Sequence, residues 1–520
     1  MKPLSESTVP ATDNISGHAH PLAGMHQPRT VEQVVALVAA ARREKTPLYP
    51  VSTGLNFGYG GKSPVLPGCA LVDLSRMNKI LNAGAISLAN PVAVIEPGVT
   101  QQQLHEYLQQ HCPELTFNVT GSARATSILG NALDRGVGYF GPRKEDVFGL
   151  EVVCGSGKVL QTGFRRLGEQ SPLAHSHPYG VGPMLDGLFF QGNFGIVTSA
   201  CFRLLPRRPC QVALSLSLRD PSQLPVFIDH LAALKREGFI ESVTHIGNQA
   251  RTHATLMHGI TRYLKQHTTL DDAALSLEAK AVLRAIAPGE WSSLGAVTGT
   301  AAQVKASMAE IRRRMKPLAK VTEVTDDKLK RGYGLLHALR FWAPARARAA
   351  AISAIRPLHA LALGVPTDAA IDNLLWLADA AHLPAADLDQ SNCGLLFINP
   401  ALPLNGAFVA ATITELEAVA QAHGHKLYMT LNIETATSLV AVINLLFDRS
   451  DAAAQARAHQ CADALLERIR GLGLEVYRAR ADMMAGMVAA QAGYWETVRA
   501  LKGELDPDNI IAPGRYNLAQ

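Results

Sequence analysis

Apolar and polar positions along the first 206 residues follow the spacing of short strands and helices. Residues 30–47 repeat apolar side chains at helical spacing behind Thr30, with Gln33 in the position that completes a helix cap. Residues 100–112 predict a second helix that also begins at a threonine. The apolar or alternating runs that predict strands, one of them a hairpin, are 47–52, 69–77, 91–100, 146–163 and 192–206. The first region is therefore predicted to be α+β.

The pattern changes after residue 207. Strands there alternate with long alanine-rich helices, of which 301–319 and 405–424 are examples, and glycine becomes less frequent. The tail, 451–515, is predicted to be helical until its last prolines. Because 520 residues exceed the length of one ordinary domain, this change is taken as a domain boundary.

Composition narrows the possible functions. Hydrophobic residues make up 48% and charged residues 18%, and the net charge of +5 is spread without a basic block, which disfavours nucleic acid as a partner. The start, residues 1–21, is polar and proline-containing, and no apolar run has the length of a membrane span. A soluble, cytoplasmic protein is expected. Seven scattered cysteines without a C-x-x-C pair predict neither disulfides nor a metal site.

The stretch YPVSTGLNFGYGGKSPV, residues 49–65, contains four glycines. Glycine exposes main-chain N–H groups, and a phosphate is the ligand that most needs such bare backbone. The spacing matches neither the dinucleotide-binding G-x-G-x-x-G motif nor a nucleoside-triphosphate loop. Taken alone, this segment is more often only a turn.

Four further segments give the glycine loop a context. They are AVIEPGVT (93–100), SILGNALDRGVGYFGP (127–142), YGVGPMLDGLFFQGNFGIVT (179–198) and LDPDNIIAPGR (505–515). In this order the five segments resemble the vanillyl-alcohol oxidase and 4-cresol dehydrogenase family of flavoproteins. The resemblance implies an α+β, two-domain PCMH-type FAD-binding fold with an α/β cap domain for the substrate. The implied division is 1–207 for the first part of the FAD domain, 208–462 for the cap, and 463–520 for a segment that returns to the FAD domain.

The resemblance also implies which residues hold FAD. Backbone N–H groups of the loop from Ser52 to Tyr59 would surround the pyrophosphate, so that main-chain dipoles balance its charge. For any single glycine of the set, tight packing is the alternative explanation. The implied FAD contacts are Pro50, Ser52, Thr53, Gly54, Leu55, Asn56, Gly58, Tyr59, Pro97, Gly98, Ser127, Leu129, Gly130, Asn131, Gly136, Gly138, Tyr139, Gly192, Asn193, Gly195, Ile196, Val197 and Arg515.

In the phenol-oxidising members, two tyrosines and an arginine hold the substrate as a phenolate, and the matching residues here are Tyr59, Tyr477 and Arg478. A guanidinium and two hydroxyls together lower the pKa of a bound phenol. A hydride can then leave the benzylic carbon for flavin N5 and give a quinone methide. Tyr139 is a further cavity candidate, and Glu434 a candidate base, although Glu434 also fits a solvated strand residue.

Departures from the family bear on the flavin linkage. Leu439, Val440 and Ala441 stand where the oxidase carries its linking histidine, and residues 374–397 contain no tyrosine to replace the dehydrogenase's link. FAD is therefore predicted to be bound non-covalently, with His382 and Cys393 as the residues that could overturn this. The segment 117–127, where the oxidase has an aspartate near flavin N5, contains no carboxylate, and its one ionisable residue is Arg124.

Three functions follow. The first is an FAD-dependent oxidoreductase that dehydrogenates a small para-substituted phenol or related aromatic. The second is the same scaffold acting on a 2-hydroxy acid, a sugar or another alcohol. The third is a degenerate flavin-binding protein without catalysis. The electron acceptor is left open between O2 and a redox carrier, and the resemblance implies a homo-oligomer, most simply a homodimer.

Overall fold

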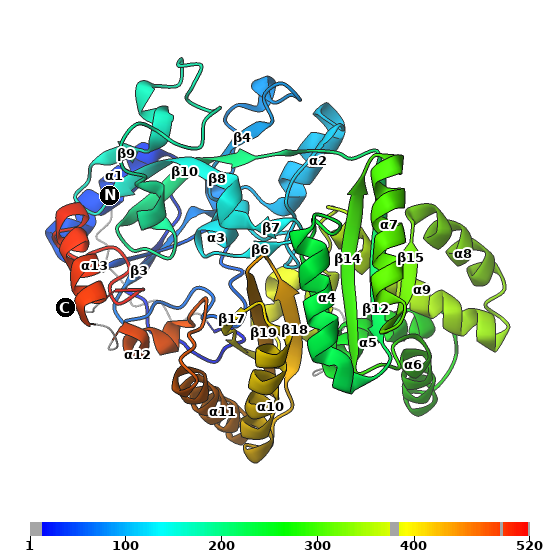
Figure 1. Cartoon of the computed structure of the whole chain (residues 1–520). Coiled ribbons are helices and arrows are strands. Elements are labelled where there is room, and N and C mark those ends of the chain that lie inside the picture. Colours follow the sequence, from blue (N-terminus) through cyan, green and yellow to red (C-terminus); the bar gives the residue numbers. More distant parts are fainter. Residues whose placement is uncertain (1–12, 375–383, 489–491, 518–520) are drawn as a thin grey trace.

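A computed structural model describes residues 13–374, 384–488 and 492–517. Figure 1 shows two bodies side by side, one built from the first 206 residues and the C-terminal residues, the other around a large sheet. The mixture of helices and strands confirms the predicted α+β class.

The first sheet of the N-terminal body is parallel and has the order β1-β3-β2, from Gly24–His26, Ala70–Asp73 and Leu48–Val51. Helix α1, Val31–Glu44, covers it with the apolar face that the spacing predicts. The helix begins at Thr30, whose side chain accepts a hydrogen bond from the Gln33 amide. The predicted helix and its N-terminal capping by Thr30 are both confirmed.

The second sheet has the order β4-β10-β8-β9, and its strands are antiparallel. Strands β8 and β9 form the predicted hairpin, and helix α2 begins after Thr100 as expected. The elements of this part are β4 (Val92–Ile95), α2 (Gln101–His111), β5 (Leu115–Thr116), α3 (Ile128–Leu133), β6 (Val137–Gly138), β7 (Gly141–Pro142), β8 (Val147–Cys154), β9 (Val159–Gln161), β10 (Gly195–Arg203) and β11 (Leu205–Pro206).

The second body is an antiparallel sheet of eight strands within the described residues, in the order β15-β12-β14-β13-β18-β19-β16, with β17 paired to β19. Its strands are β12 (Cys210–Leu218), β13 (Thr244–Asn248), β14 (Trp291–Gly299), β15 (Ala319–Val324), β16 (Cys393–Ile398), β17 (Ala401–Pro403), β18 (Tyr428–Ile433) and β19 (Ser438–Asp448).

Helices cover both faces of this sheet (Figure 1). One face packs against α4 (Leu224–Arg236), α7 (Ala301–Met315), α10 (Gly406–Ala422) and α11 (Ala452–Gly471). Behind the other face lie α5 (Gln249–His267), α6 (Asp272–Ile286), α8 (Asp326–Ala338) and α9 (Ala343–Ala362).

The two faces of the sheet differ in chemistry. Along β12, Leu214, Leu216 and Leu218 belong to the apolar core with α4 and α7, whereas Ser215 and Ser217 point the opposite way because successive side chains alternate. Register places further small or polar residues of neighbouring strands beside these serines. Small polar side chains fill less space than leucines, and a cavity opens on this face.

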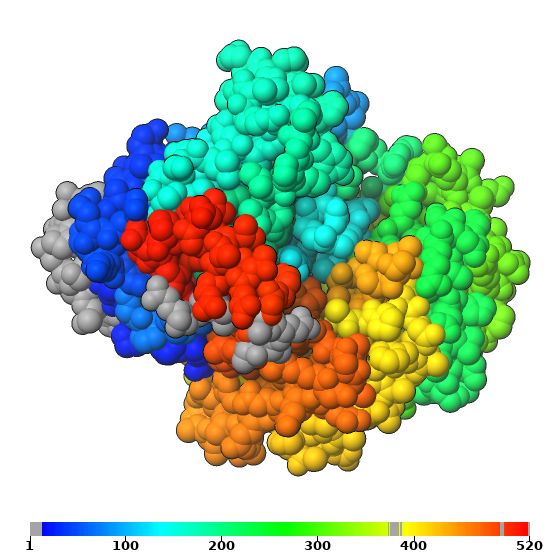
Figure 2. Space-filling view, turned by 60° about the vertical axis from the view of Figure 1, so that its left-hand side comes forward, coloured from blue at the N-terminus to red at the C-terminus, as the bar shows by residue number. Residues whose placement is uncertain are grey.

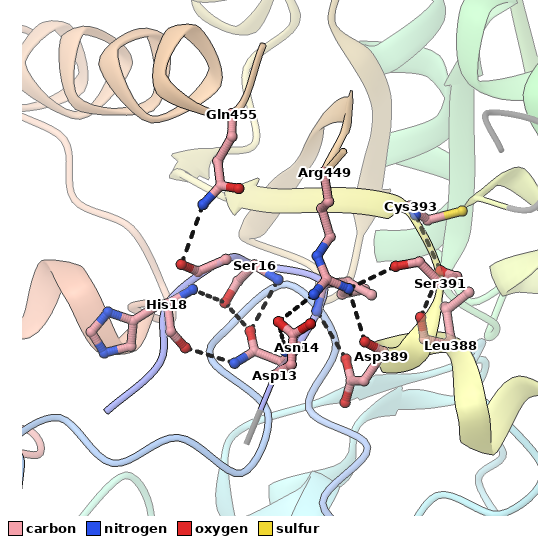
Figure 3. A network of polar contacts seen from close by, with 12 residues as sticks. Asp13, Asn14, Ser16, His18, Leu388, Asp389, Ser391, Cys393, Arg449 and Gln455 are labelled. Carbon is pink, nitrogen blue, oxygen red and sulfur yellow. Dashed lines mark hydrogen bonds and ion pairs between the residues drawn. The ribbon is translucent and has the colours of Figure 1, made fainter. Parts of the chain in front are cut away.

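Polar contacts hold the N-terminal segment 13–18 against the second body (Figure 3). The eight-stranded sheet of that body is called the cap sheet below. Asp13 pairs with Arg449, and the Ile15 amide donates to the Asp389 carboxylate at 3.0 Å. Arg449 also donates to the carbonyls of Asp389 and Ser391 at 2.8 and 2.7 Å. One guanidinium therefore connects the segment to the loop that precedes β16.

The C-terminal segment differs from the predicted continuous helix. Helix α11 ends at Gly471, residues 472–480 form no helix, and α12 (Met484–Val488) and α13 (Ala492–Leu505) follow. The expected boundary at 463 thus lies inside α11, whose Leu465 packs in the cap core. We propose that the return to the FAD domain begins after Gly471.

The C-terminal segment ends beside strand β2 of the N-terminal body. The Leu48 amide donates to the Ile510 carbonyl at 2.6 Å, and the Ala512 amide donates to the Leu48 carbonyl at 2.7 Å. In Figure 2 the red C-terminal residues lie between blue N-terminal residues and the orange residues that precede them in the chain. In the described part of the chain, no helix has the length and apolar character of a membrane span.

Candidate active site

A cavity of about 830 Å³ lies between the N-terminal body and the polar face of the cap sheet. Its walls come from the glycine loop after β2, the start of α3, the start of β10, the cap sheet and two segments near the C-terminus. The five segments that carry the family resemblance are distant in sequence, and each contributes to this one cavity.

The glycine loop has the backbone geometry that an anionic group needs. Gly54 has a φ of +75°, a left-handed conformation that side chains disfavour, and the loop residues from Ser52 to Asn56 line the cavity. Gly130 packs against it so closely that an added Cβ would lie 2.5 Å from the Ser52 Oγ. The loop and α3 therefore form a cradle that larger residues would fill, which fits a pyrophosphate-containing cofactor.

Most of the predicted FAD contacts line the cavity, namely Pro50, Ser52, Thr53, Gly54, Leu55, Asn56, Tyr59, Pro97, Ser127, Gly130, Asn131, Gly136, Tyr139, Gly192, Asn193, Gly195, Ile196, Val197 and Arg515. Four predicted contacts lie behind its wall instead: Gly58, Gly98, Leu129 and Gly138.

Packing explains these four exceptions. Gly58 faces Phe397, whose ring would lie 2.7 Å from an added Cβ, and Gly138 faces Asn118. Leu129 is fully buried in the core of the N-terminal body. Gly98 is close to the carbonyls of Ser75 and Met77 and borders a smaller neighbouring cavity. These four residues do not line the main cavity, because another side chain or the main chain occupies the space beside them, and their contact with FAD stays a prediction.

Two arginines in the cavity wall share one carboxylate. Asp134 pairs with Arg478 and with Arg515, the second at 2.9 Å. Burial alone would raise the pKa of Asp134, but the two guanidinium charges outweigh it and lower that pKa. Burial likewise acts against the charge of Arg478, and the Asp134 carboxylate reverses the effect and raises the Arg478 pKa. The network is therefore fully ionised at neutral pH.

Tyr59, Tyr477 and Arg478 lie together, as the resemblance implies. The Tyr59 and Tyr477 hydroxyls interact with each other, and the Arg478 guanidinium carbon lies 4.0 Å from the centre of the Tyr59 ring. Asn399 donates a hydrogen bond to the Tyr59 hydroxyl at 2.6 Å. Burial raises the pKa of both tyrosines, so both keep their protons at neutral pH.

Neighbouring segments hold these groups in place. The Gln191 side chain donates to the Tyr477 carbonyl at 3.1 Å, which joins the QGN segment to the end of the chain. The Tyr477 amide donates to the Asn399 carbonyl at 3.0 Å, and Arg478 donates to the Asn56 side chain. Sequence reasoning missed Asp134 and Asn399. Asp134 had a signal, because it falls within the segment 127–142 that carries the resemblance.

Tyr139 borders a different part of the cavity. Its ring lies 4.6 Å from that of His245, and His245 is held through Nδ1 by the Asn432 side-chain oxygen at 2.8 Å. Burial raises the Tyr139 pKa to about 12 and lowers the His245 pKa to about 4, so neither group is charged at neutral pH. Arg251 shares this wall, and neither His245 nor Arg251 was marked by the sequence.

Glu434 does not line the cavity, which corrects its expected position facing the flavin. It follows the last residue of β18, and its Oε1 is buried without a hydrogen-bond partner among the described residues. Burial raises its pKa to about 7. Its charge acts on Tyr477, whose pKa it raises. Glu434 can therefore influence a cavity residue without contacting a ligand.

The two residues considered for a covalent flavin link, His382 and Cys393, and the other residues at which the chain departs from the family lie as follows. His382 falls outside the described residues. Cys393 is buried in a core with Leu388 and Leu395, and its Sγ donates to the Leu374 carbonyl at 2.9 Å. Leu439, Val440 and Ala441 lie on β19, and Arg124 pairs with Asp368 at 3.1 Å. The Cys393 sulfur points into packed protein and does not line the cavity.

Comparisons with known proteins agree with this geometry. A family model described as FAD binding domain matches residues 22–163. The 1'-carboxy-chondrochloren decarboxylase of Chondromyces crocatus is 31% identical over 515 residues, which cover 96% of this chain and 91% of that protein. The flavoprotein subunit of 4-cresol dehydrogenase (hydroxylating) from Pseudomonas putida is 27% identical over 494 residues, covering 94% and 86% of the two chains.

Among solved structures, p-cresol methylhydroxylase with substrate bound matches with a TM-score of 0.78 and 25% identity over 99% of this chain and 92% of that one. The predicted family, PCMH-type fold and FAD cofactor are thereby confirmed. The chain belongs to the vanillyl-alcohol oxidase and 4-cresol dehydrogenase family of FAD-dependent oxidoreductases.

Proposed function

We propose that this protein removes a hydride from the benzylic carbon of a small para-substituted phenol. The main support is that the Tyr59 and Tyr477 hydroxyls and the Arg478 guanidinium meet at one wall of the cavity. Each of these groups stabilises a phenolate more than a neutral phenol, because hydroxyls donate hydrogen bonds and a guanidinium supplies charge.

The charge balance of the wall favours an anion there. Arg478 and Arg515 carry two positive charges and share the single negative charge of Asp134. Among the described residues of this network, one positive charge is left over. A phenol, whose pKa in water is about 10, therefore loses its proton more readily in this site.

FAD, when bound in the cavity, supplies the two-electron acceptor for the hydride. The chain itself holds the phenolate oxygen and fixes the ring. As the hydride leaves, electron density from the phenolate oxygen moves through the ring, and the substrate becomes a quinone methide. Addition of water then gives an alcohol, and loss of a proton gives an alkene.

A second candidate is oxidative decarboxylation of a phenol that has a carboxylate on the side-chain carbon adjacent to the benzylic carbon. It is favoured by the relative from Chondromyces crocatus, which is named a decarboxylase. After the hydride has left, the quinone methide takes up the electron pair of the bond to the carboxylate. Carbon dioxide leaves, and a vinylphenolate remains, so that atoms and charge balance.

The test is anaerobic titration of the purified FAD protein with para-ethylphenol and with its methyl ether, which cannot ionise. The phenol should bleach the visible flavin absorbance, and the ether should not. Product analysis separates alcohol from alkene, and a parallel titration with para-hydroxyphenylpropanoate, which has the carboxylate, tests decarboxylation. Mixing the reduced protein with O2 or with a redox carrier identifies the acceptor. If no alkylphenol reduces the flavin, the function is wrong, and 2-hydroxy acids and other alcohols are the next substrates to test.

A further inference from the structure

Arg251 is a cation in the wall of the cavity that has no charged partner among the described residues. It is the third residue of α5, and its Nη2 donates only a long hydrogen bond, 3.3 Å, to the Ala370 carbonyl. Its Nη1 is buried and has no hydrogen-bond partner among the described residues. No carboxylate of the described chain forms an ion pair with it. Buried guanidinium groups are ordinarily paired, so this one calls for an anionic partner.

Among the described residues, no group beside Arg251 balances this charge. Tyr139 and His245 are its neighbours in the wall, and both are neutral at neutral pH. Burial lowers the Arg251 pKa to about 10, so the guanidinium itself stays charged. By contrast, the other cavity-wall arginines, Arg478 and Arg515, are paired with Asp134.

We propose that Arg251 binds a carboxylate on the substrate, so that the substrate is a phenol with an anionic side chain. This inference rests on the function proposed above, in which Tyr59, Tyr477 and Arg478 hold the phenolate. The neighbours of Arg251 differ from those of Arg478, which makes Arg251 a second point of attachment on the same cavity.

The chemistry of the wall selects a carboxylate over a phosphate. One guanidinium matches one carboxylate in charge and in its two-pronged hydrogen-bonding geometry. A phosphate would bring additional negative charge, and the residues around Arg251 are neutral hydroxyls such as Thr252 and Thr255. A monoanionic alkanoate attached para to the phenol therefore fits best.

The test compares para-hydroxycinnamate with its methyl ester. Neither has a saturated benzylic carbon, so both are dead-end ligands, and their dissociation constants can be measured calorimetrically on the FAD protein without turnover. The wild type should bind the acid about tenfold or more tightly than the ester. In Arg251→Met this ratio should fall to about one, and Arg251→Lys should give an intermediate value.

Arg262→Met is the matched control, because Arg262 lies on the same helix but outside the cavity wall. It should keep the preference for the acid. FAD content and circular dichroism establish that each variant is folded. The inference is overturned if wild type binds acid and ester equally, or if Arg251→Met keeps the preference. Because binding is measured without turnover, failure of para-ethylphenol to reduce the flavin would overturn the proposed function separately.

Discussion

Asp134 and Arg478 form an ion pair in the cavity wall, and the side chain of each is less than a tenth exposed. The carboxylate comes from the segment after α3 and the guanidinium from the segment after α11, so the pair joins two parts of the chain that are 344 positions apart. Arg515 binds the other carboxylate oxygen. This arrangement holds Arg478 in position while leaving net positive charge at the cavity.

Asp134→Asn should destabilise the protein strongly. It leaves the buried Arg478 guanidinium and the partly buried Arg515 guanidinium without their common counter-ion, and breaking such a buried pair ordinarily costs about 3–5 kcal/mol. Chemical denaturation measures the change. The matched control is Asp368→Asn, which removes the partly exposed pair with Arg124 and should cost less than about 1 kcal/mol. Equal effects of the two substitutions would contradict the role given to Asp134.

Arg478→Met should shift the pH dependence of flavin reduction by para-ethylphenol. With Arg478 in place, the bound phenol ionises well below its ordinary pKa, and the rate should vary little between about pH 7 and 9. Without it, the rate at neutral pH should fall about tenfold or more and recover as pH approaches about 10. Anaerobic stopped-flow spectroscopy over this pH range measures the rate of flavin reduction. A decrease in rate by the same factor at every pH would argue against a phenolate site.

Tyr477→Phe separates hydrogen bonding from charge at the same wall. The variant keeps Arg478 and the ring but loses one buried donor, so phenol binding should weaken by about 1–2 kcal/mol with little change in the pH profile. The methyl ether of the phenol accepts hydrogen bonds poorly compared with a phenolate and serves as the control ligand. A loss shared equally by phenol and ether would indicate a packing effect.

Local signals in the sequence predicted much of the fold. Thr30 and Thr100 were expected to cap helices, and the structure places α1 and α2 directly after them. The expected helix through 472–480 was wrong because Gly473 adopts a left-handed φ of +72° and the Leu474 amide bonds back to Ile469, which ends α11. The spacing of apolar residues alone did not predict where α11 ends.

The candidate site was predictable where family motifs carried it. Tyr59, Tyr477 and Arg478 are brought together as expected, yet Asp134 and Asn399 emerge only in three dimensions because their partners are distant in sequence. Arg251 had no local signal, since a single arginine in a helix is ordinarily a solvated residue. What distinguishes Arg251 is the lack of a counter-ion among the described residues, and that is a property of the folded wall.

FAD should be released when the protein is precipitated with acid, leaving the colour in the supernatant. The described alternative link, Cys393, is packed among Leu388 and Leu395 with its Sγ bonded to the Leu374 carbonyl. Cys393→Ala should therefore leave the amount of released FAD unchanged. Flavin absorbance of pellet and supernatant gives the result, and coloured protein in the pellet would show that a covalent link exists.

Arg449→Met should loosen the N-terminal segment from the cap. It removes the ion pair with Asp13 and leaves the carbonyls of Asp389 and Ser391 without their donor, which should lower the unfolding free energy by about 2 kcal/mol. Hydrogen exchange should also increase over residues 13–18. Arg457→Met is the control, because that side chain is more than half exposed and its pair with Asp451 is long, 3.9 Å. Similar losses in both variants would contradict the structural role of Arg449.

Glu434→Gln should stabilise the protein above neutral pH. The pKa of Glu434 is about 7 in the folded protein against an ordinary 4.5, so between these values the folded chain holds one proton more than the unfolded chain. Stability therefore falls as pH rises through this window, and the full penalty applies above about pH 7. Glutamine cannot ionise and avoids the penalty, which at about 1.4 kcal/mol per pKa unit is at most about 3.5 kcal/mol.

Urea denaturation at pH 5 and pH 8 measures this effect. The difference in unfolding free energy between Glu434→Gln and wild type should be small at pH 5 and favour the variant at pH 8. Glu415→Gln serves as the control, because Glu415 is partly exposed and paired with Arg468 on the surface. Since the ionised Glu434 also raises the Tyr477 pKa, the variant tests whether this buried charge acts on the cavity: phenol binding at pH 8 should change in Glu434→Gln and stay constant in Glu415→Gln. A stability difference that does not vary with pH would show that Glu434 does not titrate in this window.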